Sequence, residues 1–187
     1  MSNIFFSSDH HFGHQNIISF SDRPFSSVEE MDEIMIQKWN KKISSSDSIY
    51  YLGDFGLCKP DRLREILKQL NGNIYLIKGN HDKSALSCKN RFEWIKDYYE
   101  LKITDSDNDE KKQRLVLFHY AIKQWNYKRA GSFHLYGHSH GNIIDDPHEL
   151  SFDVGVDCHN YYPISYTEVK EKMAKKTWKF DSSTVDL

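Results

Sequence analysis

Asn73-Ile74-Tyr75-Leu76-Ile77-Lys78-Gly79-Asn80-His81-Asp82 carries the clearest indication of how this chain folds. The apolar run over residues 73–78 is short and contains β-branched and aromatic side chains, which predicts a buried strand. Gly79 follows the strand and lets the backbone turn sharply and approach a ligand closely. Directly after it come an amide, an imidazole and a carboxylate, which can bind metal ions or transfer protons. This stretch therefore predicts a strand that delivers reactive side chains at its carboxyl end.

Four more predicted strands end in side chains of the same kind. Their polar ends are, in chain order, Asp9-His10-His11-Phe12-Gly13-His14, Gly53-Asp54-Phe55-Gly56, His119 and Gly137-His138-Ser139-His140. The strands themselves are the apolar runs over residues 3–8, 48–52, 114–118 and 133–136. In an open α/β sheet, ligands bind at the carboxyl ends of the strands. We therefore expect the five motifs to meet at one site.

Helices are predicted between the early strands and at the end of the chain. Ser26-Ser27-Val28-Glu29 resembles a capping box, and the apolar residues after it follow helical spacing. Pro60 begins a second helix, and Ser165-Tyr166-Thr167-Glu168 predicts a capped C-terminal helix. This alternation predicts an α/β fold with parallel strands early in the chain. The later chain is mostly strands, with an exposed hairpin loop over residues 105–112, and favours a second, more antiparallel sheet.

Composition narrows the class of protein. The chain has 187 residues, 39% of them hydrophobic, and we expect one domain over residues 1–187. It has neither an apolar run of membrane-spanning length nor a signal-peptide pattern, and Cys58, Cys88 and Cys158 are too scattered for a disulfide framework. We therefore expect a cytoplasmic protein without a membrane partner. The net charge of −2 gives no argument for duplex DNA as an obligatory partner. The oligomeric state stays open.

The order and content of the five motifs resemble the calcineurin-like metallophosphoesterase superfamily: Asp-x-His, Gly-Asp, Gly-Asn-His-Asp, a lone His, then Gly-His-x-His. Other stretches are similar to a small bacterial and phage branch of it. They are Phe20-Ser21-Asp22-Arg23-Pro24-Phe25, Lys38-Trp39-Asn40, His119-Tyr120 with Trp125-Asn126, and Val154-Gly155-Val156-Asp157. The resemblance covers residues 5–168 and implies a four-layer α-β-β-α sandwich of two mixed sheets, with metals at one end.

The resemblance also implies two divalent metal ions that share Asp54 as a bridging ligand. The other ligands are Asp9, His11 and His140 for one ion, and Asn80, His119 and His138 for the other. A bridging carboxylate suits ions about 3.5–4 Å apart. Only two of these ligands are charged, so two dications keep a formal surplus of about +2, which attracts phosphate and acidifies a bound water. The mixed ligands favour manganese, with iron, zinc or nickel as alternatives.

Two further residues of the Gly-Asn-His-Asp motif receive catalytic roles from the resemblance. His81 protonates the leaving oxygen or steadies the transition state, while metal-bound hydroxide attacks phosphorus in line. Asp82 orients the imidazole of His81, a usual task for a carboxylate beside histidine. His14 and Arg23 are candidate substrate contacts, and for both a structural role stays open. The loop with Lys123, Trp125, Lys128 and Arg129 is either a solvated face or a rim that steers the substrate.

The expected function is hydrolysis of phosphate esters, with diesters preferred. A phosphomonoesterase that acts on nucleotides or on phosphorylated proteins is the alternative. A catalytically silent protein-binding scaffold of the same fold is a third reading, but such a scaffold loses His81 or several ligands, and this chain keeps them. A metal-dependent amidohydrolase needs a lysine or further carboxylates at other strand ends, which the sequence lacks. Nucleotides, nucleic-acid ends, lipids and protein phosphates all remain open as substrates.

Overall fold

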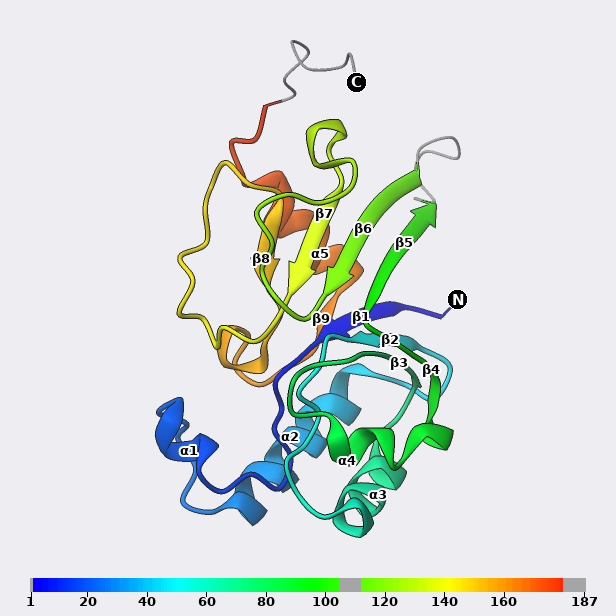
Figure 1. Ribbon diagram of the computed structural model, residues 1–187, viewed down its shortest axis with the longest axis vertical. Coiled ribbons are helices and arrows are strands. Elements are labelled where there is room, and N and C mark those ends of the chain that lie inside the picture. The colour runs from blue at the N-terminus through cyan, green and yellow to red at the C-terminus, as the bar shows by residue number, and fades with distance from the viewer. Residues whose placement is uncertain (1, 105–111, 180–187) are drawn as a thin grey trace.

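Two β-sheets form the centre of the protein, whose computed structural model describes residues 2–104 and 112–179 (Figure 1). The first sheet has the strand order β4-β3-β2-β1-β9. Its strands are β1 (Ile4–Ser7), β2 (Ser48–Tyr51), β3 (Asn73–Ile77), β4 (Phe92–Lys96) and β9 (Ile164–Ser165). The first four pair in parallel, as predicted for the early chain, and β9 pairs antiparallel with β1.

The second sheet has the order β5-β6-β7-β8. Its strands are β5 (Tyr98–Thr104), β6 (Lys112–Phe118), β7 (Phe133–Tyr136) and β8 (Ser151–Asp153). β5 and β6 pair antiparallel, although most of the predicted hairpin loop between them lies outside the described residues. β6, β7 and β8 pair in parallel, so this sheet is less antiparallel than the sequence predicts. The connections over residues 119–132 and 137–150 are long enough for parallel crossovers without helices of the usual length.

Five α-helices and three short 3₁₀ helices lie among the strands in the described parts of the chain. The α-helices are α1 (Ile17–Phe20), α2 (Val28–Lys42), α3 (Pro60–Gln69), α4 (Lys83–Leu86) and α5 (Tyr166–Ala174). The 3₁₀ helices are η1 (Lys89–Arg91), η2 (Lys128–Ala130) and η3 (Val156–Cys158). No helix in these parts has both the length and the apolarity that a bilayer crossing requires.

Helices α2 and α3 cover the outer face of the first sheet (Figure 1). Met31, Met35 and Trp39 of α2 are fully buried in one cluster with Leu63 of α3 and Ile49 of β2. These α2 residues are four positions apart, so one apolar stripe of the helix faces the sheet. The predicted helix start is one residue too early, because Ser27 is the N-cap and accepts a hydrogen bond from the backbone N–H of Glu30.

A second apolar cluster lies between the two sheets. Phe6 and Leu52 of the first sheet pack there with Leu117 of the second, and Val169 and Met173 bring α5 into the same cluster. The predicted capping box of α5 is confirmed: Ser165 and Glu168 exchange side-chain and backbone hydrogen bonds. The two sheets are therefore held together by a shared core rather than by a linker.

The strand directions bring the polar motifs to one end of the molecule. β1, β2 and β3 are parallel, so their carboxyl ends share an edge of the first sheet. Beyond the strands, the backbone N–H of Asp9 donates to the carbonyl of Gly53, and that of Gly137 donates to the carbonyl of His119. A β-bridge from Ser8 to Gly155 joins the corresponding edge of the second sheet. The polar motifs of both sheets therefore reach one place.

Candidate metal centre

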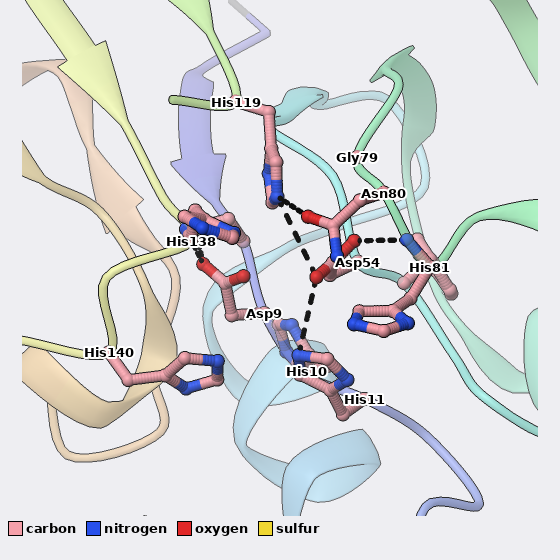
Figure 2. Close-up of polar contacts among 12 residues, drawn as sticks. Asp9, His10, His11, Asp54, Gly79, Asn80, His81, His119, His138 and His140 are labelled. Carbon is pink, nitrogen blue, oxygen red and sulfur yellow. Dashed lines mark hydrogen bonds and ion pairs between the residues drawn. The ribbon is translucent and has the colours of Figure 1, made fainter. Parts of the chain in front are cut away.

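The structure brings together all seven side chains predicted to bind metal ions (Figure 2). They form two groups, which are Asp9, His11 and His140, and Asp54, His119 and His138. Within each group, one potential ligand atom per residue lies within 4.8 Å of the others. Asn80 joins the second group, because its Oδ1 atom lies 3.1 Å from Nε2 of His119. The division into two groups is the one that the resemblance implies.

Asp54 lies between the two groups. Its Oδ2 atom is 3.6 Å from Nε2 of His11 and also 3.6 Å from Nε2 of His119. Its other oxygen, Oδ1, accepts a hydrogen bond from the backbone N–H of His81. The carboxylate is buried and held in this orientation, so Oδ2 can serve cations on both sides. This is the arrangement that a bridging ligand requires.

Several of these ligands have strained backbones. The φ angles of Asp9, His11, Asp54, His138 and His140 are all positive, between 49° and 66°. Residues other than glycine avoid this left-handed region, and each such residue costs about 1–3 kcal/mol unless the surroundings impose it. Strain concentrated on metal-capable side chains points to a functional site, since packing alone does not select these residues.

Two glycines explain how the loops approach so closely. A Cβ atom on Gly53, whose φ is +94°, would lie 2.5 Å from Nδ1 of His119. A Cβ atom on Gly79 would lie 2.5 Å from the backbone nitrogen of Asp54. Since neither neighbour can move without displacing a ligand, both positions need glycine. These glycines let the loops approach each other closely, while the predicted approach of their backbone to a ligand stays a prediction.

Burial leaves polar atoms of the first group without partners. Asp9 is fully buried. Its burial is the largest cause, and the charge of Asp153 the second, of a pKa well above the usual value for an aspartate. Its Oδ1 atom and both ring nitrogens of His11 have no hydrogen-bond partner in the described chain. Such groups are costly to bury unless something compensates them. A divalent cation would compensate Oδ1 of Asp9 and one ring nitrogen of His11, so the donor set fits a metal ion.

Two of the histidines, His11 and His138, favour the neutral form that metal binding needs. Burial lowers the pKa of His11 to about 2 and, with the charge of His119, lowers that of His138. A neutral imidazole has a free lone pair to donate to a metal. Nδ1 of His119 lies 2.6 Å from the carbonyl oxygen of Leu52, and donation of its N–H there leaves Nε2 for the metal. The ligands are therefore preorganised.

Asp157 is a functional residue for which the sequence predicts no role. Its Oδ2 atom lies 2.7 Å from Nδ1 of His140, so donation of that N–H leaves Nε2 of His140 for a metal. Burial alone would raise the pKa of Asp157, but hydrogen bonds from His140 and Arg23 outweigh burial and lower it. The motif Val154-Gly155-Val156-Asp157 stands out in the sequence, yet nothing in it identifies a partner on a distant loop.

The predicted substrate contact of Arg23 is wrong. Its side chain is unexposed, and the guanidinium donates to Asp157 and to the backbone carbonyls of Asp9 and His10. Its charge is neutralised beneath the ligands and does not reach the surface. The structural alternative for this residue is therefore the correct one.

The predicted contact between Asp82 and the imidazole of His81 is also wrong. Asp82 is buried and accepts hydrogen bonds from the backbone N–H groups of Asp54, Phe55 and Gly79. In the described chain no hydrogen bond joins it to the His81 ring. Asp82 thus fixes the two loops that follow β2 and β3 and acts on the site through their backbone. His81 itself is exposed, with its ring centroid 5.6 Å from that of His11.

The remaining candidates lie around the rim. His14 is half-buried, and its ring centroid is 5.5 Å from that of His11, so it stays a candidate substrate contact. Tyr120, which the sequence did not single out for the site, is 38% exposed and donates from its hydroxyl to Oδ1 of Asn80. Trp125 is buried and donates to the carbonyl of Ser132, and Lys128 forms an ion pair with Glu149. Trp125 is therefore a packing residue, and the charge of Lys128 is paired. Neither side chain forms part of an exposed rim that could steer a substrate.

Comparisons with known proteins place these features in context. No family model matches the chain. The uncharacterized protein MJ1445 of Methanocaldococcus jannaschii is 34% identical over 172 residues, which cover 88% of each chain. The gene 66 protein of Mycobacterium phage D29 is 27% identical over 198 residues, which cover 91% of this chain and 96% of that protein. The crystal structure of AQ665 from Aquifex aeolicus, a protein of unknown function, has a TM-score of 0.69 at 24% identity. It covers 92% of this chain and 100% of that one, and supports the α/β architecture alone.

Proposed function

This chain belongs to the same family as MJ1445 of Methanocaldococcus jannaschii, and we propose that it is a dinuclear metal-dependent phosphoesterase that hydrolyses phosphodiesters. One observation carries the proposal: Oδ2 of Asp54 is equidistant from His11 and His119, which belong to two separate groups of ligands. A carboxylate shared in this way is typical of hydrolases with two metal ions. The unpartnered buried atoms of Asp9 and His11 support the same conclusion.

Asp9, His11, Asp54 and His140 would hold one divalent ion, and Asp54, Asn80, His119 and His138 the other. Manganese suits these ligands best, with iron, zinc or nickel as alternatives. When bound, the ions would supply an activated water and would neutralise charge on the phosphoryl oxygens. The protein contributes the fixed positions of the ligands. Asp82 holds the loops of Asp54 and Gly79, and Asp157 holds His140.

His81 is the residue that we assign to proton transfer. It is exposed beside the ligands, and its backbone N–H is anchored on Oδ1 of Asp54. Its ring is therefore held at the site while its nitrogens remain accessible to a substrate. In the proposed reaction the imidazolium donates a proton to the oxygen of the leaving alcohol, which avoids the release of an alkoxide. Histidine suits this task because its pKa is ordinarily close to neutral pH.

A diester fits the site because two of the candidate ligands and the proposed acid are exposed. Asn80, His81 and His138 are exposed, and Tyr120 stands at the rim. An open surface admits a phosphate with substituents on both sides. A phosphomonoesterase is the second candidate, since only two of the seven ligands carry charge and the surplus of positive charge also suits a dianion.

We also propose that the fold is the four-layer sandwich of the calcineurin-like metallophosphoesterases. The two mixed sheets, the helices over the first sheet and the order of the motifs support this assignment. The cysteines of the described chain are free thiols, which supports a reducing, cytoplasmic location.

A screen of metal-loaded protein tests the proposed activity. The protein is stripped of metal, reloaded with manganese and assayed against a panel of phosphate mono- and diesters. We expect hydrolysis of aryl diesters, and none in the chelated control. If no ester in the panel is hydrolysed by protein that holds two ions, the proposed activity is wrong.

A further inference from the structure

Arg23 and Asp157 form a buried ion pair between two distant parts of the chain. Nε of Arg23 lies 2.8 Å from Oδ1 of Asp157, and a terminal nitrogen lies 2.8 Å from Oδ2. The two residues are 134 positions apart, so the pair joins the loop after α1 to η3. The Arg23 side chain is unexposed and that of Asp157 is 10% exposed. The contact is therefore bidentate and shielded from water.

Both ends of this pair reach ligands of the first metal position. The guanidinium donates to the carbonyl oxygens of Asp9, at 2.7 Å, and His10, at 2.8 Å. These carbonyls flank the backbone that carries Asp9 and His11, both at positive φ. On the other side, Oδ2 of Asp157 lies 2.7 Å from Nδ1 of His140. The pair thus contacts His140 through a side-chain hydrogen bond, and it contacts the backbone that carries Asp9 and His11 through two hydrogen bonds to carbonyl oxygens.

The second metal position is held differently. His119 lies against the carbonyl of Leu52, and Tyr120 donates to Asn80. The backbone N–H of His138 donates to Oδ2 of Asp9, and that of His11 donates to the carbonyl of Asp54, so the links between the two groups do not run through the Arg23–Asp157 pair. Loss of the Arg23–Asp157 pair should therefore affect the two positions unequally.

We infer that Arg23 and Asp157 are positioning residues that set the affinity of the metal position formed by Asp9, His11 and His140. The inference rests on the proposed function, because it presupposes a dinuclear centre. A buried ion pair contributes little to folding stability on balance, since desolvation offsets its attraction. Groups that orient metal ligands typically change metal affinity by about 10–100-fold when they are removed. The pair explains why Arg23 and Asp157 both stand out in the sequence although neither is a ligand.

Manganese titration of the metal-free, full-length protein tests the inference. Isothermal titration calorimetry should show two binding steps for the wild type. Arg23→Met and Asp157→Asn should each weaken one step by about 10–100-fold and leave the other near its wild-type affinity. Lys42→Met is the matched control, because it breaks an ion pair between α2 and α5 away from the ligands. It should leave both steps unchanged.

Two backgrounds identify which position is weakened. His119→Gln removes a ligand of the second group, so the strong binding step that remains belongs to the first metal position. Asp157→Asn, added to this background, should weaken that step. His140→Gln removes a ligand of the first group, so the remaining strong step belongs to the second position, and Asp157→Asn should leave that step near its affinity in the background. Equal weakening in both backgrounds, or none in either, would overturn the inference.

A double variant separates metal positioning from a merely structural role. Arg23→Met combined with Asp157→Leu replaces the pair with apolar side chains and leaves no unpaired buried charge, so folding stability should fall only by the hydrogen bonds that the carbonyls of Asp9 and His10 lose. The first metal position should stay weak, since Nδ1 of His140 has lost its acceptor. Recovery of wild-type affinity at both steps would show that the pair only supports folding. A wild-type protein that shows two binding steps but hydrolyses no ester would contradict the proposed activity. The inference about Arg23 and Asp157 would still stand, because it is tested by metal affinity alone.

Discussion

The backbone N–H of His81 donates a hydrogen bond to Oδ1 of Asp54 over 2.8 Å, which ties the proposed acid directly to the shared ligand. The bond uses the main chain of His81, so the imidazole stays available for substrate. Replacement of the side chain therefore leaves the anchor of Asp54 in place. The roles of the two residues can be separated by mutation.

His81→Ala should lose most turnover and keep its metal. Loss of a residue that transfers a proton typically lowers the rate by about 10²–10⁴-fold. The measurement is kcat on an aryl diester, together with metal content by plasma mass spectrometry. If the variant binds fewer ions than the wild type, His81 is a ligand and its assignment as an acid is wrong.

Asp54→Asn should behave in the opposite way. The amide keeps the shape of the side chain but removes the charge that lies 3.6 Å from both His11 and His119. We expect metal content and activity to fall together, because both positions lose a shared anionic ligand. A variant that retains two tightly bound ions would show that Asp54 does not bridge them.

Diesters should be better substrates than monoesters. Thr104, where β5 ends, and Lys112, where β6 begins, lie at the end of these strands away from His119, which follows β6. The exposed side chains of His81 and His138 are accordingly left open to a phosphate substituted on both sides. The measurement is kcat/KM on matched aryl mono- and diesters with manganese. A tenfold or greater preference for the monoester would favour the phosphomonoesterase.

His134 should make folding stability depend on pH. It is buried, with Nδ1 at 3.1 Å from the carbonyl of Val116 and Nε2 accepting from the backbone N–H of Ile122, and burial lowers its pKa from 6.5 to about 4. Between these values the unfolded chain binds more protons, so stability is complete above about pH 6.5 and falls as the pH drops toward 4. One pKa unit is worth about 1.4 kcal/mol, so the loss approaches about 3 kcal/mol.

His134→Gln tests this dependence, because glutamine keeps a donor and an acceptor but does not titrate. Urea unfolding in the presence of a chelator, from pH 4.5 to 7.5, should show a shallower fall in stability for the variant. Other buried histidines such as His10, whose pKa burial lowers to about 3, still contribute to both proteins. Identical curves for the two proteins would contradict the assignment to His134.

Much of the fold follows from the sequence, because apolar runs bounded by glycine and polar residues have few alternatives to buried strands. The strand over residues 133–136 is predicted without error, and that over residues 73–78 to within one residue. β4 and β9 are missed for a physical reason. β4 has the charged residues Glu93 and Lys96 among only five, which interrupts the apolar run, and β9 has two residues that pair only because β1 lies beside them. Whether such short segments form strands depends on their tertiary contacts, which the sequence does not show.

The side chains that meet at the candidate site are predictable because each lies within a few residues of the end of a predicted strand. The residues that hold those side chains in place are not predictable from the sequence. Asp157 acts on His140 and Arg23 from another loop, and a sequence does not show which side chains will meet across 134 positions. The positive φ angles are equally hidden, since aspartate and histidine, unlike glycine, give no sign of a left-handed backbone. The misplaced role of Arg23 has the same origin, because burial of a charge depends on partners that are distant in sequence.

The most direct test of a dinuclear phosphoesterase is the rate of bis(p-nitrophenyl) phosphate hydrolysis as manganese is added stepwise to the metal-free protein. The account predicts little activity up to one equivalent per chain and a steep rise during the second, because both positions must be filled around Asp54. Full activity at one equivalent, or no hydrolysis with two ions bound, would contradict it.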